Sequence, residues 1–268
     1  MTIDPVLLAH ARLALSCLDL TSLNDADTEG DVQELCTRAQ SPFGPVAAVC
    51  VWPRLAAVAV RLLPRHITVA AVANFPHGSA DIAHAVRDTK TIVDSGAREI
   101  DLVLPYSHLI AGDEKSVTQL LKAVRNACLG YTLKVILETG ELKSDALIAR
   151  ASELSLLEGA DFLKTSTGKT AVSATIPAAR SMLRTIAAQP STAARAGFKA
   201  SGGIRTVADA APYFDLVSGM LGPSALAPER LRIGASSLLN DIESVLGGNG
   251  RAGRAGRAGV AGVAPSAY

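Results

Sequence analysis

Two lysines in the second half of the chain have the residue type and setting that carbonyl chemistry needs. Lys164 ends the apolar segment Asp161–Lys164 and precedes Thr-Ser-Thr-Gly, and Lys199 lies thirty-five positions later, shortly before Gly-Gly. A lysine at the end of a buried strand is costly to desolvate unless its charge is compensated. Burial and a neighbouring cation both lower a lysine's pKa, toward a neutral amine that can attack a carbonyl carbon. The pair therefore predicts an imine-forming enzyme.

Further polar side chains fall at the downstream ends of other apolar segments. Strand periodicity places Lys134 and Glu138 on one face of their segment, and Glu99 and Asp101 on one face of theirs. Ionised groups inside a protein need partners, so these carboxylates should meet the lysines. A purely structural network of ion pairs is the competing interpretation, but so many charges at one end of the strands favour an active site. The expected set is Asp19, Cys50, Asp101, Lys134, Glu138, Lys164, Lys199 and Ser236.

Two glycine-containing turns late in the chain predict a phosphate site. Gly202-Gly203 follows the Lys199 segment, and Gly234, Ser236 and Ser237 precede an expected helix over Leu238–Leu246. Glycines let backbone N–H groups approach an anion closely, and the start of a helix offers unpaired donors with a favourable dipole. Arg205 or Lys169 could add positive charge. Taken alone, Gly202-Gly203 could be a simple turn, and Ser236 could be a simple helix cap.

Composition and charge limit the functions that the chain can have. A formal net charge of +1 gives no general field for polyanions, so nucleic acid is not an expected partner. The five histidines lack metal-ligand spacing and the four cysteines lack C-x-x-C, so neither a metal nor another cofactor is expected. No secretory signal and no apolar run of spanning length is visible, which predicts a cytoplasmic protein without a membrane partner.

Strand and helix patterns alternate along most of the chain, which predicts parallel strands joined by helical crossovers. A TIM (β/α)8 barrel fits best, with an extra helix beginning at Asp4-Pro5, and an open doubly wound sheet is the alternative. Capping residues are expected at Ser116, at Ser144, and at Ser79 or Asp81. The expected strands are Ser16–Leu20, Val46–Val51, Ile67–Asn74, Glu99–Leu104, Leu133–Glu138, Asp161–Lys164, Gly197–Ser201 and Leu231–Gly234.

The composition changes at Gly247: Arg-Ala-Gly occurs three times within Arg251–Gly259, and the last residue is Tyr268. A segment rich in Gly and Ala buries too little surface to offset its ordering entropy. We therefore expect a catalytic barrel domain over residues 1–246 and a flexible, solvated tail over residues 247–268.

The motifs resemble those of the class I deoxyribose-phosphate aldolases over nearly the whole length, to about residue 246. The lysine segment KTSTG at residues 164–168 is highly specific to that family. The other matching stretches are LDLTSLN at 18–24, VCVWP at 49–53, VANFPHG at 72–78, EIDLV at 99–103, LKVILETG at 133–140, GFKASGGIR at 197–205 and GASSLL at 234–239.

The resemblance implies reversible cleavage of 2-deoxy-D-ribose 5-phosphate into acetaldehyde and D-glyceraldehyde 3-phosphate, without a cofactor. Lys164 would form the Schiff base, Lys199 would lower its pKa and join proton transfer, and Asp101 would act as general acid and base. Lys134 would organise the charges, and the terminal Tyr268 would reach back to the substrate. The substrate-binding set would be Asp19, Thr21, Cys50, Thr167, Lys169, Gly202, Gly203, Arg205, Gly234, Ser236 and Ser237.

Other assignments stay open at the level of sequence. The partners implied are a sugar phosphate and an aldehyde, and a homodimer is plausible for the family. Another Schiff-base aldolase acting on a different sugar phosphate would also use a buried lysine pair. A catalytically silent barrel that binds sugar phosphates would not need to keep Asp101, Lys164 and Lys199 together.

Overall fold

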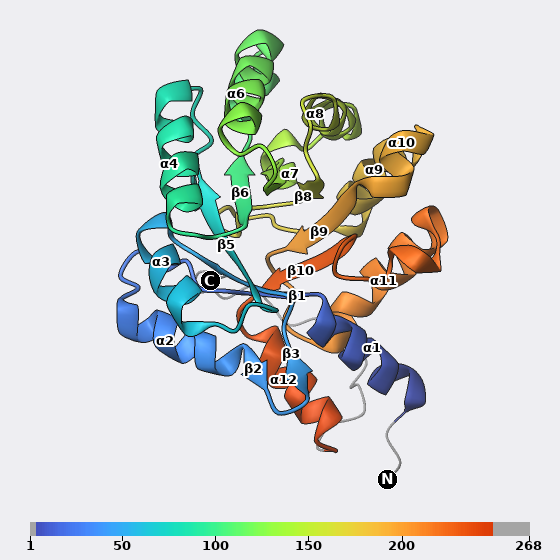
Figure 1. The fold of residues 1–268 in the computed structure, drawn as a ribbon. Coiled ribbons are helices and arrows are strands. Elements are labelled where there is room, and N and C mark those ends of the chain that lie inside the picture. The colour runs from blue at the N-terminus through green and yellow to red at the C-terminus, as the bar shows by residue number, and fades with distance from the viewer. Residues whose placement is uncertain (1–3, 249–268) are drawn as a thin grey trace.

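The eight expected strands form one closed parallel barrel (Figure 1). The structure, a computed structural model, describes residues 4–248. The first strand pairs with the last strand on one side and with the second strand of the ring on the other, so the open-sheet alternative is wrong. In chain order the barrel strands are β1 (Leu18–Thr21), β4 (Ala48–Val51), β5 (Thr68–Ala73), β6 (Glu99–Val103), β7 (Thr132–Ile136), β8 (Phe162–Lys164), β9 (Gly197–Ser201) and β10 (Leu231–Ala235).

Helices surround the barrel, and α1, the extra N-terminal helix, packs beside α11 and α12 (Figure 1). A short hairpin, β2 (Gln40–Ser41) with β3 (Gly44–Pro45), precedes β4. This arrangement is the predicted (β/α)8 barrel. The helices are α1 (Pro5–Ser16), α2 (Glu29–Arg38), α3 (Pro53–Leu62), α4 (Ile82–Asp94), α5 (Tyr106–Ile110), α6 (Glu114–Ala127), α7 (Thr139–Leu142), α8 (Asp145–Leu157), α9 (Ile176–Ala187), α10 (Pro190–Arg195), α11 (Val207–Leu221), η1 (Pro223–Ala225) and α12 (Leu238–Leu246).

Side-chain hydrogen bonds at the helix starts confirm two of the expected caps and correct the third. Asp81 accepts from the backbone of His84 at the start of α4, and Ser144 accepts from Leu147 at the start of α8. Helix α6 begins three residues earlier than expected, because the Asp113 carboxylate accepts from the backbone N–H of Ser116. A carboxylate at this position also interacts favourably with the positive end of the helix dipole.

Alternation along the strands separates two environments. On β6, Ile100 and Leu102 belong to the apolar layer between barrel and helices, whereas Glu99 and Asp101 point to the interior, where they contact Lys134. The same alternation applies to β7, where Leu133 and Val135 lie in the apolar layer. The barrel interior therefore collects charged side chains while the outer layer supplies the hydrophobic stabilisation. A separate interior cluster is apolar and consists of Leu23, Cys50, Ala70 and Val72.

Most ends of the expected strands differ from the structure by one or two residues, and two of these differences matter for the site. Ser16 is the last residue of α1 rather than the first of a strand, and β7 stops at Ile136. Glu138, expected as the last strand residue, has a positive φ of 56° in the left-handed region. The boundary at residue 246 coincides with the end of α12, but the two-part division stays a prediction because residues 249–268 lie outside the described part.

Candidate active site

One carboxylate, that of Asp101 on β6, lies between three lysines from three other strands. Its Oδ2 accepts from Lys164 Nζ at 2.8 Å and from Lys199 Nζ at 2.8 Å, and its Oδ1 accepts from Lys134 Nζ at 2.9 Å. All four side chains are buried, with exposures of at most 1 %. Parallel pairing places Lys134 beside Asp101 on β7, and Lys199 beside Lys164 on β9. The predicted clustering of these residues is therefore confirmed.

Two further carboxylates compensate two of the lysines. Asp19 on β1 accepts from Lys199 and lies 3.6 Å from Lys134 Nζ. Glu99 accepts from Lys134. Lys164, in contrast, forms its ion pair with Asp101, which it shares with both other lysines. Of the three amines, Lys164 is the least compensated.

This asymmetry separates the pKa values of the lysines. Burial lowers the pKa of Lys164, Asp101 opposes this, and the charge of Lys199 adds to it, so the pKa lies below its usual value. Burial acts on Lys199 too, but Asp101 and Asp19 outweigh it and raise its pKa well above the usual value. For Lys134, Asp101 and Glu99 likewise outweigh burial and raise the pKa. Of this cluster, Lys164 is the amine that loses its proton most easily and can act as a nucleophile.

Cys50 adds an apolar wall rather than a second nucleophile. Its Sγ lies 3.9 Å from Asp101 Oδ2, and its neighbours in the interior cluster are apolar. Burial, and then the charge of Asp101, raise the pKa of the thiol to about 11. The thiol is therefore protonated at neutral pH and cannot compete with Lys164 as a nucleophile.

The turn after β8 is held by Glu138, which follows β7. The Glu138 carboxylate accepts from the hydroxyls of Thr167 and Thr170, and from the backbone N–H of Thr167 at 3.3 Å. Burial raises the Glu138 pKa, against the effect of these hydrogen bonds. Glu138 was expected among the lysines, and it is buried where the charge of Lys164 lowers its pKa. Its hydrogen bonds, however, go to the threonine-containing turn, because the chain leaves the strand before reaching it. Backbone strain at such a position is characteristic of functional sites.

The two glycine-containing turns meet at the carboxyl ends of β9 and β10. A hollow there is lined by Gly202, Gly203, Ile204, Arg205, Gly234, Ala235, Ser236 and Ser237. Gly202 and Gly203 have φ values of 83° and 80°, a backbone conformation that residues with a Cβ atom rarely adopt. Ser236 and Ser237 are exposed immediately before α12. The residues expected to bind phosphate are thus brought together, except Lys169, which does not line this hollow.

Gly234 has a second role that its motif did not indicate. A Cβ atom built on Gly234 would lie 2.2 Å from Ser201 Oγ and 3.0 Å from Lys199 Cε. A larger residue would therefore displace the Ser201 side chain and crowd that of Lys199. Thr21, the remaining expected binding residue, donates its hydroxyl to the backbone oxygen of Asp19 at 2.8 Å and so fixes the end of β1.

Two buried hydroxyls near the lysines are left available for a ligand. Within residues 4–248, Ser166 Oγ and Ser201 Oγ have no hydrogen-bond partner although both residues are buried. Unsatisfied buried hydroxyls are unfavourable, so they mark positions where a bound molecule could supply the partner. Neither serine was predicted as a site residue, although each belongs to a quoted lysine motif.

Sequence reasoning also missed Arg232, a buried arginine on β10. Its guanidinium group binds Asp19 Oδ1 at 2.7 Å and Glu99 Oε1 at 2.8 Å. Strand alternation could have found it, since Leu231 and Ile233 face the outer apolar layer and leave Arg232 to the interior. Tyr268, expected to reach the substrate, lies outside the described residues.

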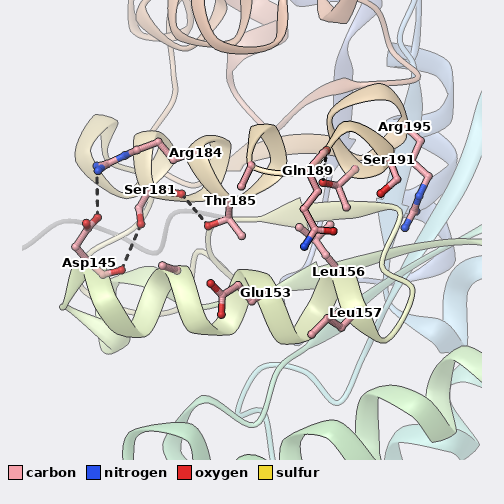
Figure 2. A pocket seen from close by; sticks show the side chains of 13 residues that line it. Asp145, Glu153, Leu156, Leu157, Ser181, Arg184, Thr185, Gln189, Ser191 and Arg195 are labelled. Carbon is pink, nitrogen blue, oxygen red and sulfur yellow. Dashed lines mark hydrogen bonds and ion pairs between the residues drawn. The ribbon is translucent and has the colours of Figure 1, made fainter.

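A different hollow lies outside the barrel, between α8 and the helices α9 and α10 (Figure 2). Its charged residues include Asp145 and Arg184, which form a long and exposed ion pair of 3.7 Å. Leu156 and Leu157 contribute apolar surface. None of the interior lysines lines this hollow, so it is separate from the chemistry of the barrel.

Two searches of the described residues gave no candidates. In residues 4–248, no group of three or more His, Cys, Asp or Glu side chains is placed to hold a metal ion. None of the helices in this same range has the length and apolar character needed to cross a membrane.

A closed ring of eight parallel strands with buried reactive groups at the strand ends defines the class of (β/α)8-barrel enzymes. Comparison with known proteins narrows the class. The sequence model described as DeoC/LacD family aldolase matches residues 13–243. The chain therefore belongs to the DeoC/LacD family of aldolases, which are lyases acting on carbon–carbon bonds.

Individual relatives agree with this family. The chain is 48 % identical over 241 residues to the deoxyribose-phosphate aldolase of Agrobacterium fabrum strain C58, covering 89 % of this chain and 92 % of the relative. It resembles the tetrameric deoxyribose phosphate aldolase structure from Aeropyrum pernix with a TM-score of 0.66 and 26 % identity, over 89 % of this chain and 96 % of that one. A Toxoplasma gondii ME49 structure shares the fold with a TM-score of 0.81 at 24 % identity, over 90 % and 95 % of the two chains.

Proposed function

We propose that this aldolase reversibly cleaves 2-deoxy-D-ribose 5-phosphate into acetaldehyde and D-glyceraldehyde 3-phosphate through a Schiff base on Lys164, in the breakdown of deoxynucleosides. The observation that carries the proposal is the lowered pKa of Lys164 beside the Asp101 carboxylate at 2.8 Å. The 48 % identity to the Agrobacterium fabrum deoxyribose-phosphate aldolase supports the substrate. The hollow after β9 and β10 supports a phosphate group on it.

The roles of the charged residues follow from their positions. The neutral Lys164 amine attacks the substrate aldehyde, and loss of water leaves a protonated imine. This imine accepts the electron pair of the breaking C2–C3 bond, so an enamine forms instead of a free carbanion, while the C3 hydroxyl loses its proton. Asp101 and Lys199 are placed to move protons, because Asp101 accepts hydrogen bonds from both Lys164 and Lys199. Such positioned acid–base catalysis contributes about 10²–10⁴-fold.

Borohydride trapping tests the covalent step. Acetaldehyde and borohydride should convert Lys164 into N-ethyl-lysine, which peptide mass analysis would locate, because borohydride reduces an imine irreversibly. Modification should be strongest at Lys164, since Lys134 and Lys199 have raised pKa values and stay protonated. Trapping at another lysine would remove Lys164 from the role of nucleophile. No trapping at all would favour a barrel that only binds sugar phosphates.

A substrate panel separates the proposed activity from that of another Schiff-base aldolase. Faster cleavage of a different sugar phosphate would keep the mechanism and replace the substrate. The homodimer and the cytoplasmic location expected from the sequence stay predictions. The tetramer in the Aeropyrum pernix structure is a property of that protein.

The phosphate hollow gives a test with a matched pair of variants. Ser237 precedes α12, where unpaired N–H groups favour an anion. Ser237→Glu should lower the ratio of kcat/KM for 2-deoxyribose 5-phosphate to that for 2-deoxyribose by about 100-fold, equivalent to about 2.7 kcal/mol. Ser237→Gln adds a similar volume without the charge and should change the ratio much less. Equal effects of Glu and Gln would mean that the hollow does not hold the phosphate.

A further inference from the structure

The ion-paired cluster inside the barrel holds more cations than carboxylates. Asp19, Glu99 and Asp101 face Lys134, Lys164, Lys199 and Arg232, and each of these side chains is at most 8 % exposed. Buried charges are tolerated when they are paired, and an unpaired one is strongly unfavourable. With three carboxylates for four cations, the cluster is least costly when one cation gives up its proton.

Arg232 cannot be the group that does so. An arginine keeps its proton in proteins at any ordinary pH. Asp19 and Glu99 outweigh the effect of burial and raise the Arg232 pKa above its usual value. The guanidinium group binds Asp19 Oδ1 and both oxygens of Glu99, at 2.7, 3.1 and 2.8 Å. The cation that gives up its proton must therefore be one of the three lysines.

Arg232 is also held firmly in place. Its Nε donates to the backbone oxygen of Pro228, and its guanidinium carbon lies 5.7 Å from the centre of the Phe162 ring. Phe162 in turn packs against Gly197, where a Cβ atom would lie within 2.3 Å of the ring. These contacts keep the guanidinium group at the carboxylates instead of letting it withdraw toward solvent.

The carboxylates that Arg232 binds are the same ones that hold protons on two of the lysines. Glu99 accepts from Lys134, and Asp19 accepts from Lys199. Lys164 has no ion pair with either, and within residues 4–248 its ion pair is with Asp101. We propose that Arg232 and Glu99 are a positioning pair that fixes the charge of the cluster and thereby leaves Lys164 as its free amine. The inference rests on the proposed function only in taking Lys164 as the nucleophile.

The other titratable groups around Lys164 do not change this balance. Cys50 on β4 is a neutral thiol because burial raises its pKa to about 11. Glu138 is a buried carboxylate that binds the hydroxyls of Thr167 and Thr170, and it forms no ion pair with a lysine in residues 4–248. The charge of Lys164 lowers the Glu138 pKa, but it does so less than the threonine hydrogen bonds, so Glu138 is a weaker partner of Lys164 than Asp101 is. The remaining charged neighbours are Asp19 on β1, Glu99 and Asp101 on β6, Lys134 on β7, Lys199 on β9 and Arg232 on β10.

The test is a charge-balance cycle on the full-length protein. Arg232→Met leaves three cations for three carboxylates, Glu99→Gln leaves four for two, and the double variant restores one excess cation. The pKa of Lys164 is measured by NMR of protein carrying ¹³Cε-labelled lysine, which needs no substrate. The pH midpoint of borohydride trapping with acetaldehyde is the second readout.

We expect opposite shifts from the two single variants. Arg232→Met should raise the Lys164 pKa by about one unit, which lowers the free-amine fraction at neutral pH about tenfold. Glu99→Gln should lower the Lys164 pKa, and the double variant should return this pKa to near the wild-type value. The proposal would be overturned if both single variants shifted the Lys164 pKa in the same direction, or if Arg232→Met did not shift it. Opposite shifts identify a charge effect, because a general loosening of the interior would move the pKa in the same direction in both variants.

Matched controls keep the result interpretable. Arg230→Met removes a nearby arginine whose side chain, within residues 4–248, donates to the backbone oxygens of Ala193, Ala194 and Ala196, and it should leave the Lys164 pKa unchanged. Arg232→Lys keeps a positive charge and should keep the pKa close to wild type. If Arg232→Met does not fold, Arg232→Gln removes the same charge with a polar side chain, and its upward shift of the Lys164 pKa against the downward shift in Glu99→Gln decides the question. A wrong substrate assignment would alter turnover but not this NMR titration.

Discussion

Replacing Lys164 by methionine should abolish carbon–carbon cleavage while leaving a folded barrel. The side chain is buried, and its amine lies 2.8 Å from Asp101 in the interior. Neither Lys134 nor Lys199 can take over, because raised pKa values keep both protonated at neutral pH. We expect kcat to fall by on the order of 10⁴–10⁶-fold, the size that loss of a covalent nucleophile has in other enzymes. Steady-state kinetics in the cleavage direction measures the change.

The same substitution should stabilise the protein, which separates loss of chemistry from loss of structure. The Lys164 pKa is lower in the folded state than in the unfolded chain, so unfolding takes up a proton at pH values between the two. Wild-type stability therefore rises with pH through that window and is reduced below it. Methionine has a similar shape and no charge, so Lys164→Met should raise Tm at neutral pH by about 2–4 °C, corresponding to about 1 kcal/mol.

An exposed lysine provides the control for this variant. Lys90 lies on the surface of α4, so Lys90→Met should change neither kcat nor the trapping of acetaldehyde. Residual cleavage above about one per cent in Lys164→Met, confirmed by a purified sample free of other aldolases, would contradict the assignment of the nucleophile. A fall in Tm together with a loss of helical signal would instead indicate that the lysine is mainly structural.

Strand alternation explains why the sequence predicted so much of the site. Every second residue of a barrel strand points to the interior, so Asp101 on one strand and Lys134 on the next could be placed there without coordinates. The meeting of the two glycine-containing turns in one hollow was predictable for a related reason, because the ends of parallel strands meet at one end of the barrel. These inferences required only the period of the strands and their common direction.

Sequence reasoning was less accurate at the ends of strands and helices, where the regular periodicity of the chain stops. Glu138 binds the turn after β8 and forms no ion pair with the lysines of residues 4–248, because β7 ends at Ile136 and the backbone turns into the left-handed region. The start of α6 moved because Asp113, not Ser116, supplies the cap. Arg232 was missed for another reason: it belongs to no recognised motif, and its importance appears only when the charges of six strands are counted together.

Asp101→Asn should have the second-largest effect, because one carboxylate compensates three amines. The amide keeps the shape of the side chain but removes the negative charge and turns one of its acceptor atoms into a donor. Lys134, Lys164 and Lys199 would each lose a partner at 2.8–2.9 Å. We expect kcat to fall about 10²–10⁴-fold through loss of acid–base catalysis. Removing one partner from a buried ion pair also costs about 3–5 kcal/mol of stability.

The stability loss in Asp101→Asn should depend on pH with a defined sign. Burial raises the Asp101 pKa, but the three lysines outweigh it and hold the pKa well below its usual value. The carboxylate therefore contributes stability above the unfolded pKa of about 3.9, and this contribution is lost as the pH falls through the folded value. Denaturant unfolding should show a large difference between wild type and variant at neutral pH, and a shrinking one in acid.

A second aspartate separates the role of the cluster from a general effect of Asp→Asn. Asp113 also has a lowered pKa, to about 2, owing chiefly to hydrogen bonds from Ser116, but it is a helix cap at the surface. Asp113→Asn should leave kcat unchanged and alter stability far less than Asp101→Asn, because asparagine also serves as a helix cap. Near-wild-type turnover in Asp101→Asn would show that the three amines organise the reaction without their shared anion. The charge-balance account of Lys164 would then have to be abandoned, since Asp101 is its only ion-pair partner among residues 4–248.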